Sequence, residues 1–496
     1  MTFESFSLKN RWHHLGLIFV VAVIVRALVF GCYIAPHGYY LQADSRDYHY
    51  CAHSLALGRG MMRPDNAYPI FWRTPGYPIY LSIFYSIFGP QGLDFNQNKM
   101  ALETSIWVQI FVCSTIPILL FFLALYLAQS MMLAWIAAWI AVFHIGFVLA
   151  SCYILSDALA TVLLLLFFLF FYRSFRLIGE PILHILTDQS MIVDVLLAAF
   201  FLGLYTWLRP NGQFTVLVSV FILLLGACAW RIKIKKIILF LLLFFSIIGG
   251  WYVRNYQLTG HVFFCPMTGA YLQTFCAPRI LRTVTGKPLM DCMKYLMGHV
   301  MQETARETIR LQKEAPHLYV ARELVCSNIA MPIIKAHPFY FMYDWLREVM
   351  KTIFDPYASQ IVAFVNNSFS YDPAEEFLFE KINLWLFAQN MPPFLGFFCW
   401  LEFFFLLWFW IGLFGGIWLF LIKPLFTPEE ASIHTKFYRS LWLKTGFFIG
   451  GLVFMTGGFG YARLRMPVEP LMIILTLTWW LWIFNKKPNL KTNIGK

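Results

Sequence analysis

The stretch that decides the fold is LGLIFVVAVIVRALVFGCYIA, residues 15–35, together with LQADSRDYHYCAHSLALGRG, residues 41–60, which follows it closely. The first part is an apolar run long enough to cross the roughly 30 Å hydrocarbon core of a bilayer as a helix. The second part begins with two aspartates, Asp44 and Asp47, and continues in a helical pattern rich in tyrosine. The sequence therefore places two acidic side chains directly at the end of its first predicted membrane span.

The composition of the whole chain indicates a membrane protein. Hydrophobic residues make up 59% of its 496 positions and charged residues only 13%, whereas about a quarter of a soluble protein is charged. Apolar runs of about 18 residues or more recur along the chain. The first run is too long for the core of a signal peptide and lacks a small-residue cleavage site, so we expect it to stay as a helix. The predicted fold class is an all-α polytopic membrane protein.

The apolar runs predict a bundle of about 10–11 transmembrane helices. The predicted spans are 15–35, 104–128, 131–150, 156–172, 192–208, 213–230, 236–253, 394–422, 441–458 and 466–485. A shorter aromatic-rich stretch, 76–89, is expected to be an interfacial helix in the first outer loop, with an eleventh span as the alternative.

Three parts follow from this pattern of spans. Residues 1–253 form an N-terminal transmembrane module, which includes the first outer loop, 36–103. Residues 254–393 are the one large polar region and carry helical patterning. Residues 394–496 contain the remaining transmembrane helices.

Lysine and arginine in the short loops set the predicted orientation. With both termini in the cytoplasm, most of the basic residues outside the long loop fall on the inner side, as the positive-inside rule requires. Residues 36–103 and 254–393 then lie on the extracytoplasmic face. The net charge of +12 is therefore a membrane-surface feature, and we expect no nucleic-acid partner. The predicted location is the plasma or inner membrane, or the endoplasmic reticulum in a eukaryote.

The ten cysteines have no CxxC spacing. Five lie in or beside apolar segments, where a cysteine acts as a small hydrophobic residue. Cys265, Cys276, Cys292 and Cys326 share the long loop, and a disulfide among them requires an oxidising compartment. Their pairing stays open.

The first outer loop carries two aspartates close together in sequence, Asp44 and Asp47, which we call the acidic corner. On a helix, Asp44, Asp47 and Tyr48 share one face, and the alternative for the acids is a solvated helix start, where they favour the dipole. Arg73 follows in FWRTPGYPIYL, where prolines fix an extended lead into the interfacial helix, or simply a turn.

Two further outer corners lie near the ends of predicted spans. Asp157, in SCYILSDALATVLLLL, falls in the first turn of its span, where helix capping with Ser156 is the alternative role. In LYTWLRPNGQF, Arg209 precedes a proline that opens the next span, so an arginine stands beside a free helix N-terminus. Such an arrangement binds anions, although an interfacial arginine is the alternative.

The remaining corners are basic as well. Arg254, in GGWYVRNYQLTGH, ends a span on the outer side, where a snorkelling arginine is the alternative. GGFGYARLRMPVEP contains Tyr461, Arg463 and Arg465, followed by Glu469 in the first turn of the last span.

One arginine lies inside a span instead of at its end. Arg26 sits within the run 15–35, where an ionised arginine costs roughly 2.5–3.5 kcal/mol on insertion scales. We expect it to form a structural ion pair.

The charged residues at the outer ends of the predicted spans together favour the binding of a lipid phosphate and a hydroxyl group. Arginine binds phosphate through a planar fork of donors, so a lipid phosphate would meet Arg209, Arg254 and the Arg463/Arg465 pair. Asp44 would stay ionised to receive a hydroxyl group. No Walker loop, HExxH, GxSxG or Cys/His zinc spacing occurs. No cofactor is certain, and a divalent cation between the two aspartates and a phosphate is compatible on charge alone.

The order of these motifs resembles that of the GT-C glycosyltransferases. ADSRDYHYCAHSLALGRG and RTPGYPIYL are followed by LSDALATVLLLLFF, GLYTWLRPNGQF, WYVRNYQLTGHVF and YARLRMPVEPLM. The series is similar to the branch of dolichyl-phosphate-mannose–protein mannosyltransferases and aminoarabinose–lipid A transferases. It covers most of 15–275 and 440–485, and 281–390 matches no pattern of the family.

The resemblance implies an integral-membrane enzyme with its site outside the cytoplasm. It implies that a sugar passes from a polyprenyl-phosphate donor to a lipid, glycan or protein acceptor. It implies that Asp44 is a general base or orients the acceptor, with Asp47, Tyr48 and Asp157 orienting the acceptor, the loop or a cation. Donor-phosphate contacts fall on Arg209, Arg254, Arg463 and Arg465, with Arg73, Tyr461 and Glu469 in support.

Two rival functions use the same residues. A transporter or flippase of lipid-linked saccharides would bind the phosphate without chemistry, and a ligase would move a whole glycan. Transporters usually hold their polar residues near the bilayer midplane and contain internal repeats. This sequence shows no repeat and its polar residues gather at one face, which favours the enzyme.

Overall fold

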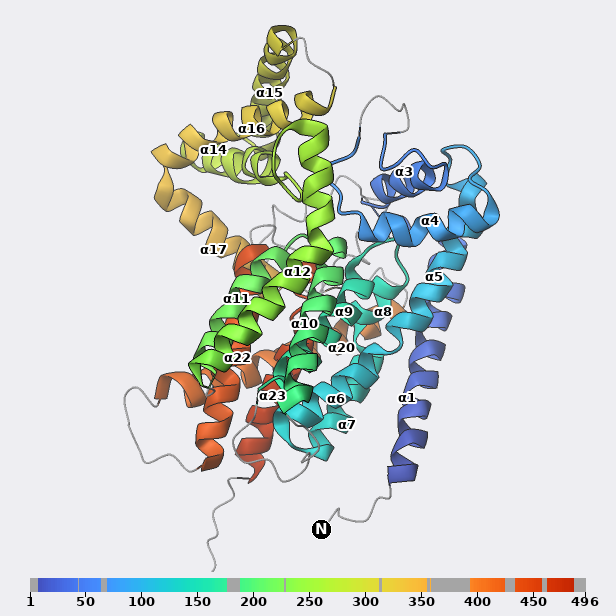
Figure 1. Cartoon of the computed structure of the whole chain (residues 1–496), viewed down its shortest axis with the longest axis vertical. Coiled ribbons are helices and arrows are strands. Elements are labelled where there is room, and N and C mark those ends of the chain that lie inside the picture. The colour runs from blue at the N-terminus through green and yellow to red at the C-terminus, as the bar shows by residue number, and fades with distance from the viewer. Residues whose placement is uncertain are drawn as a thin grey trace, which may run out of the picture.

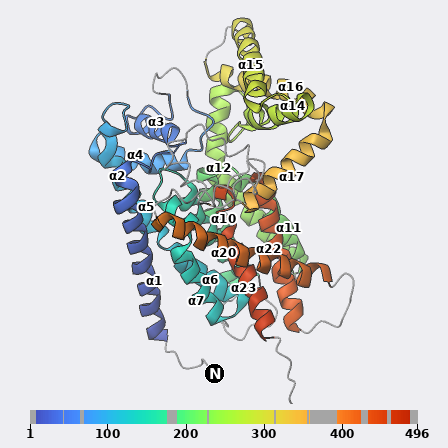
Figure 2. The ribbon, with the colours of Figure 1, turned by 180° about the vertical axis from the view of Figure 1, so that it is seen from behind.

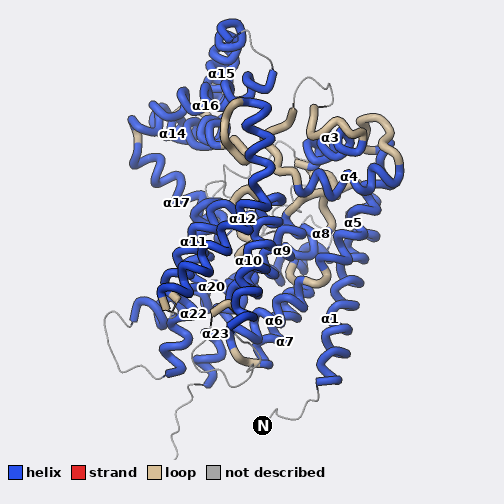
Figure 3. The backbone as a smooth tube through the Cα atoms, in the orientation of Figure 1, coloured by secondary structure: helices blue, strands red, loops and turns tan. Residues whose placement is uncertain are grey.

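The computed structural model describes residues 8–42, 44–63, 69–175, 188–226, 229–311, 315–354, 357, 393–423, 433–456 and 462–485. These residues form helices and connecting loops, with no β-strand among them (Figure 3). A helix satisfies its backbone hydrogen bonds within one segment, which is what the interior of a bilayer demands. The predicted all-α architecture is confirmed.

A described helix stands at every predicted span. They are α1 (Leu8–Leu28), α5 (Lys99–Cys113) with α6 (Ile116–Ala128), α7 (Met131–Phe143) with α8 (Ile145–Ser151), α9 (Asp157–Arg173), α10 (Asp188–Leu208), α11 (Gly212–Leu225), α12 (Trp230–Thr259), α20 (Pro393–Gly416), α22 (Ile433–Thr456) and α23 (Glu469–Asn485). Among the described residues, five helices are long and apolar enough to cross a membrane, or six if the pair α7 and α8, bent by 50°, is one broken span. α11 and α23 are shorter apolar helices. The chain is a multi-pass membrane protein.

The helices outside the bundle gather at one of its ends. α1 begins and α23 ends at one end of the bundle, and the opposite end carries two helical groups (Figures 1 and 2). One group is α3 (Ser45–Ala56) and α4 (Gly76–Phe88) from the first loop. The other is α13 (Thr268–Tyr271), α14 (Ala277–Thr285), α15 (Leu289–Leu311), α16 (Ala315–Ala336) and α17 (Pro338–Phe354). We call the group α13–α17 the outer layer.

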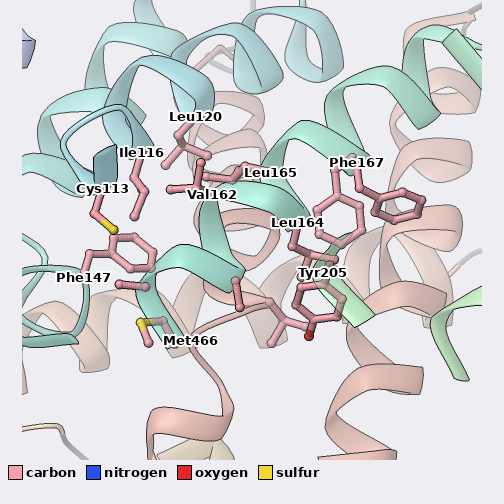
Figure 4. Packing of buried hydrophobic residues seen from close by; sticks show 14 of the residues in the cluster. Cys113, Ile116, Leu120, Phe147, Val162, Leu164, Leu165, Phe167, Tyr205 and Met466 are labelled. Atoms are coloured by element: carbon pink, nitrogen blue, oxygen red, sulfur yellow. The ribbon is translucent and has the colours of Figure 1, made fainter. Parts of the chain in front are cut away.

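The bundle core packs where α5, α6, α8, α9 and α10 meet. Figure 4 shows buried side chains from these helices, among them Leu120, Phe147, Leu165 and Tyr205, together with Met466. α7 contributes a stripe of buried alanines, Ala134, Ala137, Ala138 and Ala141. Small residues let helix backbones approach closely, and close van der Waals packing drives helix association inside a membrane.

An irregular segment between α8 and α9 is supported by polar side chains. The Nε2 of Gln109 donates to the carbonyls of Ala150, Ser151 and Tyr153 at 3.3, 3.1 and 2.9 Å. The hydroxyl of Tyr77 in turn donates to Oε1 of Gln109 at 3.0 Å. Non-helical backbone at membrane depth is tolerated only where protein groups satisfy it. These bonds hold in place the turn that leads to Asp157.

α4 has the character of an interfacial helix, as predicted. Ile79, Ile83 and Ile87 are exposed at spacings of four residues, whereas Leu81 and Tyr85 are buried. The exposed isoleucines therefore form one apolar stripe along a helix at the end of the bundle.

Arg26 differs from its prediction. Among the described residues no carboxylate contacts its fully buried side chain, and Nη1 donates instead to the carbonyl of Ala22 at 3.1 Å. Backbone carbonyls are a common partner for an intramembrane cation. In the long loop, Cys265, Cys276, Cys292 and Cys326 are all free thiols.

A buried ion pair connects the outer layer to the bundle. Nε of Arg465 donates to Oε1 of Glu469 at 2.7 Å, and Nη1 donates to the carbonyl of Ile353, at the end of α17, at 2.6 Å. The hydroxyl of Tyr357 donates to Oε2 of Glu469 at 3.0 Å, and Nε2 of His144, at the break between α7 and α8, lies 3.6 Å from the same oxygen. The Arg465–Glu469 pair therefore joins α17, α23 and the α7–α8 break.

Glu469→Gln should lower the midpoint of thermal unfolding sharply. The substitution removes the carboxylate that binds Nε of the buried Arg465, and loss of one partner of a buried ion pair typically costs about 3–5 kcal/mol. The control is Glu103→Gln at the Lys99–Glu103 pair, where the lysine is well exposed and the cost should stay below about 1 kcal/mol. Equal shifts in the two variants, measured in the same detergent, would contradict the role of the buried pair.

The position of the outer layer outside the cytoplasm can be tested by labelling. With the exposed Cys32 replaced by serine, Met301→Cys on α15 should react with a membrane-impermeant maleimide added to intact cells, because Met301 is exposed in the outer layer. Lys235→Cys, near the start of α12, should react only in inside-out vesicles. The reverse pattern would invert the predicted topology.

Candidate active site

The acidic corner is built on the start of α3. Asp44 is the N-cap residue of this helix and Asp47 lies in its first turn. The hydroxyl of Ser45 accepts from the backbone N–H of Gln42 at 2.7 Å and donates to the carbonyl of Ile154 at 2.9 Å. The helix start is therefore tied to the irregular segment between α8 and α9.

Arg73 is held against the end of α10. The hydroxyl of Thr74, the next residue, donates to the carbonyl of Leu208 at 3.0 Å. Gly76 allows this approach, since a Cβ atom there would lie 2.7 Å from the carbonyl oxygen of Trp207. The RTPG sequence thus brings the segment before α4 beside the position of Arg209.

The guanidinium of Arg73 bridges the two aspartates. Nη2 donates to Oδ1 of Asp44 at 2.7 Å, and Nε donates to Oδ2 of Asp47 at 2.9 Å. The indole of Trp72 also donates to Oδ2 of Asp47, at 3.0 Å. The guanidinium lies 5.4 Å from the centre of the Tyr48 ring, a cation–π contact. Sequence reasoning missed Trp72, although it stands next to Arg73 in the same motif.

Arg463 reaches Asp44 from the far end of the chain. Its Nη2 donates to Oδ2 of Asp44 across 419 positions of sequence. Burial alone would raise the pKa of Asp44, but Arg463 and Arg73 outweigh it and hold that pKa well below its usual range. Asp44 is therefore an ionised carboxylate bracketed by two guanidinium groups.

A second ion pair lies beside the first. Asp157, buried in the first turn of α9, pairs with the guanidinium of Arg209. The hydroxyls of Tyr48 and Ser156 are 3.3 Å apart, which links this turn to α3. Burial, followed by the nearby charge of Arg463, lowers the pKa of Arg209 to about 10. Arg209 thus lies within electrostatic reach of the Asp44 group.

Arg254 lies at the edge of this cluster. Its guanidinium stacks over the rings of Trp251 and Phe71, at 4.2 and 5.3 Å from their centres, and donates to Oδ1 of Asn255 at 2.7 Å. No carboxylate in the described part of the chain contacts it. The stacking on Phe71 holds Arg254 beside the segment that carries Arg73.

Arg465 and Glu469 lie outside this cluster, and Tyr461 lies outside the described residues. Arg465 is fully buried in its ion pair with Glu469, so its side chain points into the bundle and away from Asp44. The Arg463–Arg465 turn nevertheless connects that pair to the cluster. His144 and Tyr357, which complete the buried pair, were missed, although a histidine within an apolar run is a usable signal.

The candidate active site therefore combines five short segments. Its members are Asp44, Asp47, Tyr48, Trp72, Arg73, Asp157, Arg209 and Arg463, with Arg254 beside them. No group of three or more His, Cys, Asp or Glu side chains in the described ranges could hold a metal ion. A divalent cation between Asp44 and Asp47 would have to displace the bridging guanidinium of Arg73.

Comparison with known proteins identifies the fold. No protein-family model matches the sequence, and no curated protein matches it. Two crystal structures of an oligosaccharyltransferase from Archaeoglobus fulgidus match 97% of the chain, at a TM-score of 0.50 and 12% identity. One is AglB in complex with an inhibitory peptide and a dolichol-phosphate, and the other is an apo form. ArnT from Cupriavidus metallidurans overlaps at a TM-score of 0.36, too loosely to support an inference.

The match concerns the fold and only part of the larger protein. The chain spans about half the length of the archaeal structures, which it covers to 51% and 52%. At 12% identity the similarity extends to the arrangement of helices and no further. The chain has a GT-C-like fold, as the order of its motifs predicted.

Proposed function

We propose that the protein is an integral-membrane glycosyltransferase, which moves a sugar from a polyprenyl-phosphate donor to an acceptor on the extracytoplasmic side. The observation that carries this proposal is the ionised Asp44, bracketed by Arg73 and Arg463 with Arg209 close by. A carboxylate among several arginines offers both groups that such a transfer needs. The GT-C-like fold supports transfer of a sugar over binding of a lipid phosphate without chemistry.

The donor phosphate would bind to the arginines. Arg209 and Arg463 each pair with one aspartate, and Arg254 lies beside them without a carboxylate partner in the described ranges. A phosphate can accept bidentate hydrogen bonds from such groups. Guanidinium groups fixed in place before the reaction stabilise the charge that grows on the departing lipid phosphate.

Asp44 would bind and orient the hydroxyl group of the acceptor. When a phosphate draws Arg463 away, one oxygen of Asp44 becomes free to accept a hydrogen bond from the acceptor hydroxyl. The new bond joins the oxygen of the acceptor hydroxyl to the anomeric carbon, the bond from this carbon to the phosphate oxygen breaks, and the hydroxyl proton passes to Asp44 or to water. In-line attack inverts the anomeric carbon. The low pKa of Asp44 favours orientation of the hydroxyl over strong base catalysis.

The larger arrangement of the chain fits this reaction. We assign the site to 36–103 and to the outer ends of the module 1–253 and of residues 394–496. Residues 254–393 would contact the lipid, glycan or protein acceptor. Both termini would lie in the cytoplasm, in the plasma membrane or, in a eukaryote, the endoplasmic reticulum. A divalent cation is not required by this scheme.

Transfer of a whole glycan is the second candidate. It is supported by the likeness in fold to an oligosaccharyltransferase. A flippase is less well supported, because the clustered charges lie at one end of the bundle and not at its middle. Analysis of the product by mass separates one sugar from a whole glycan, and absence of any transfer would leave the flippase.

Asp44→Asn should reduce transfer by about 10²–10⁴-fold while donor binding is kept. The amide retains shape and hydrogen bonding but loses the negative charge that receives the hydroxyl proton. The measurement uses purified protein, a labelled polyprenyl-phosphate sugar and a cell-envelope acceptor.

Asp47→Asn is the matched control, since Asp47 shares Arg73 with Asp44 but does not contact Arg463. Its loss should be smaller. If Asp47→Asn abolishes transfer and Asp44→Asn does not, the two roles are exchanged. If neither variant changes the rate, the acids serve only the helix start.

Arg209→Ala should weaken binding of the labelled donor strongly, and Arg209→Lys should restore part of it, because lysine keeps the charge without the planar fork. The control is Arg46→Ala, at an exposed arginine of α3 that donates to the hydroxyl of Tyr50. Thermal unfolding of each variant checks that the protein is intact. Equal donor affinity in wild type and Arg209→Ala would remove Arg209 from the site.

A further inference from the structure

α17 is an amphipathic helix whose apolar face points away from the protein. Its exposed large side chains recur at helical spacing and are Phe339, Tyr340, Met342, Tyr343, Leu346 and Met350. Phe339 is 80% exposed and Tyr343 is 69% exposed. Positions separated by three, four and seven residues fall on one face of a helix. We call this surface the α17 stripe.

The opposite face of α17 is charged and buried. Nη1 of Arg279, on α14, lies 3.6 Å from Oδ2 of Asp344, and Nη2 lies 3.4 Å from Oε2 of Glu348. Nζ of Lys351 lies 3.1 Å from Oε1 of Glu348. The helix therefore buries its ions against the outer layer and exposes its aromatic and methionine side chains. In a helix surrounded by water the two faces would be exchanged.

The C-terminal half of α17 packs against membrane helices. The ring of Phe354 lies 4.5 Å from that of Trp410 on α20, centre to centre, and the ring of Trp345 lies 4.5 Å from that of Phe454 on α22. α20 exposes an apolar surface of its own, which includes Leu407 and Ile411. The C-terminal end of the α17 stripe therefore lies beside the exposed apolar surface of a helix that is long and apolar enough to cross a membrane.

α17 slopes from the rest of the outer layer down to the bundle, and its lower part reaches the level of a second apolar stripe. That stripe is on α4, with Ile79, Ile83 and Ile87 exposed, on the other side of the bundle in Figures 1 and 2. A flat membrane surface can meet both stripes where they reach the same level. α15 projects farther from the bundle than either helix.

We propose that α17 lies in the interfacial region of the membrane, with the α17 stripe in contact with the lipid of the outer leaflet. The proposed occupant is lipid and not protein, because the C-terminal end of the stripe adjoins the exposed apolar surface of the membrane helix α20 and reaches the level of α4. Burial of apolar side chains at this boundary holds such helices in the interface. Through Arg279 the helix would then hold the outer layer at a fixed height over the membrane. This placement does not depend on transfer by Asp44.

The test measures the depth of spin labels in lipid nanodiscs. Phe339→Cys and Tyr343→Cys are each labelled in a Cys32→Ser protein, and Met301→Cys on α15 is the matched exposed control. The unsubstituted Cys32→Ser protein reports labelling of the remaining native thiols. Collisions with oxygen, which concentrates in lipid, are compared with collisions with a water-soluble nickel chelate.

Labels at 339 and 343 should collide more with oxygen than with the nickel chelate, and the label at 301 should show the reverse order. If the two α17 labels behave like the label at 301, the stripe faces water and the proposal is wrong. If they are shielded from both reagents, a protein surface such as a second copy covers the stripe, which also overturns the assignment to lipid. Because two separate positions are labelled, failure of one variant to fold leaves the other to decide.

Discussion

The carboxylate of Asp44 is the point where distant parts of the chain meet. Arg73 approaches from the same outer loop, and Arg463 approaches from the turn before the last helix. A carboxylate that is partly withdrawn from water needs compensating charge, and two guanidinium groups supply it here. The first span, the interfacial α4 and the C-terminal helices therefore have to come together in one arrangement. Arg209, paired with Asp157, adds a fourth segment to the same arrangement.

The breaks between α8 and α9 and before α23 position the charged residues around Asp44. The irregular backbone between α8 and α9 would be costly inside a bilayer, and the side chain of Gln109 donates to the carbonyl of Tyr153 in this segment and to two carbonyls at the end of α8. The same segment accepts the hydroxyl of Ser45 and so positions the start of α3. At the other side, Glu469 binds Arg465 and leaves Arg463, two residues earlier, directed toward Asp44. Buried polar groups thus set the geometry that the apolar core alone would leave open.

Sequence reasoning reached most members of the cluster, because each stands at the outer end of a predicted helix. Asp44, Asp157, Arg209 and Arg463 were all identified from such positions, and the structure brings them together. Trp72 was overlooked because a tryptophan near a membrane surface is usually read as part of an aromatic belt. Such a reading treats the indole as an anchor and ignores its N–H as a hydrogen-bond donor.

Hydropathy by itself determined the helical spans and the all-α fold, because an apolar run in lipid can satisfy its backbone only as a helix. It also determined that the acids and arginines gather at helix ends. Tertiary structure alone decided the partner of each charge. Arg463 and Arg465 differ by two positions, yet one reaches Asp44 and the other is buried against Glu469. Arg26 donates to a backbone carbonyl of its own helix, that of Ala22. Partner choice depends on the relative placement of distant helices, which the local pattern of apolar and polar residues does not encode.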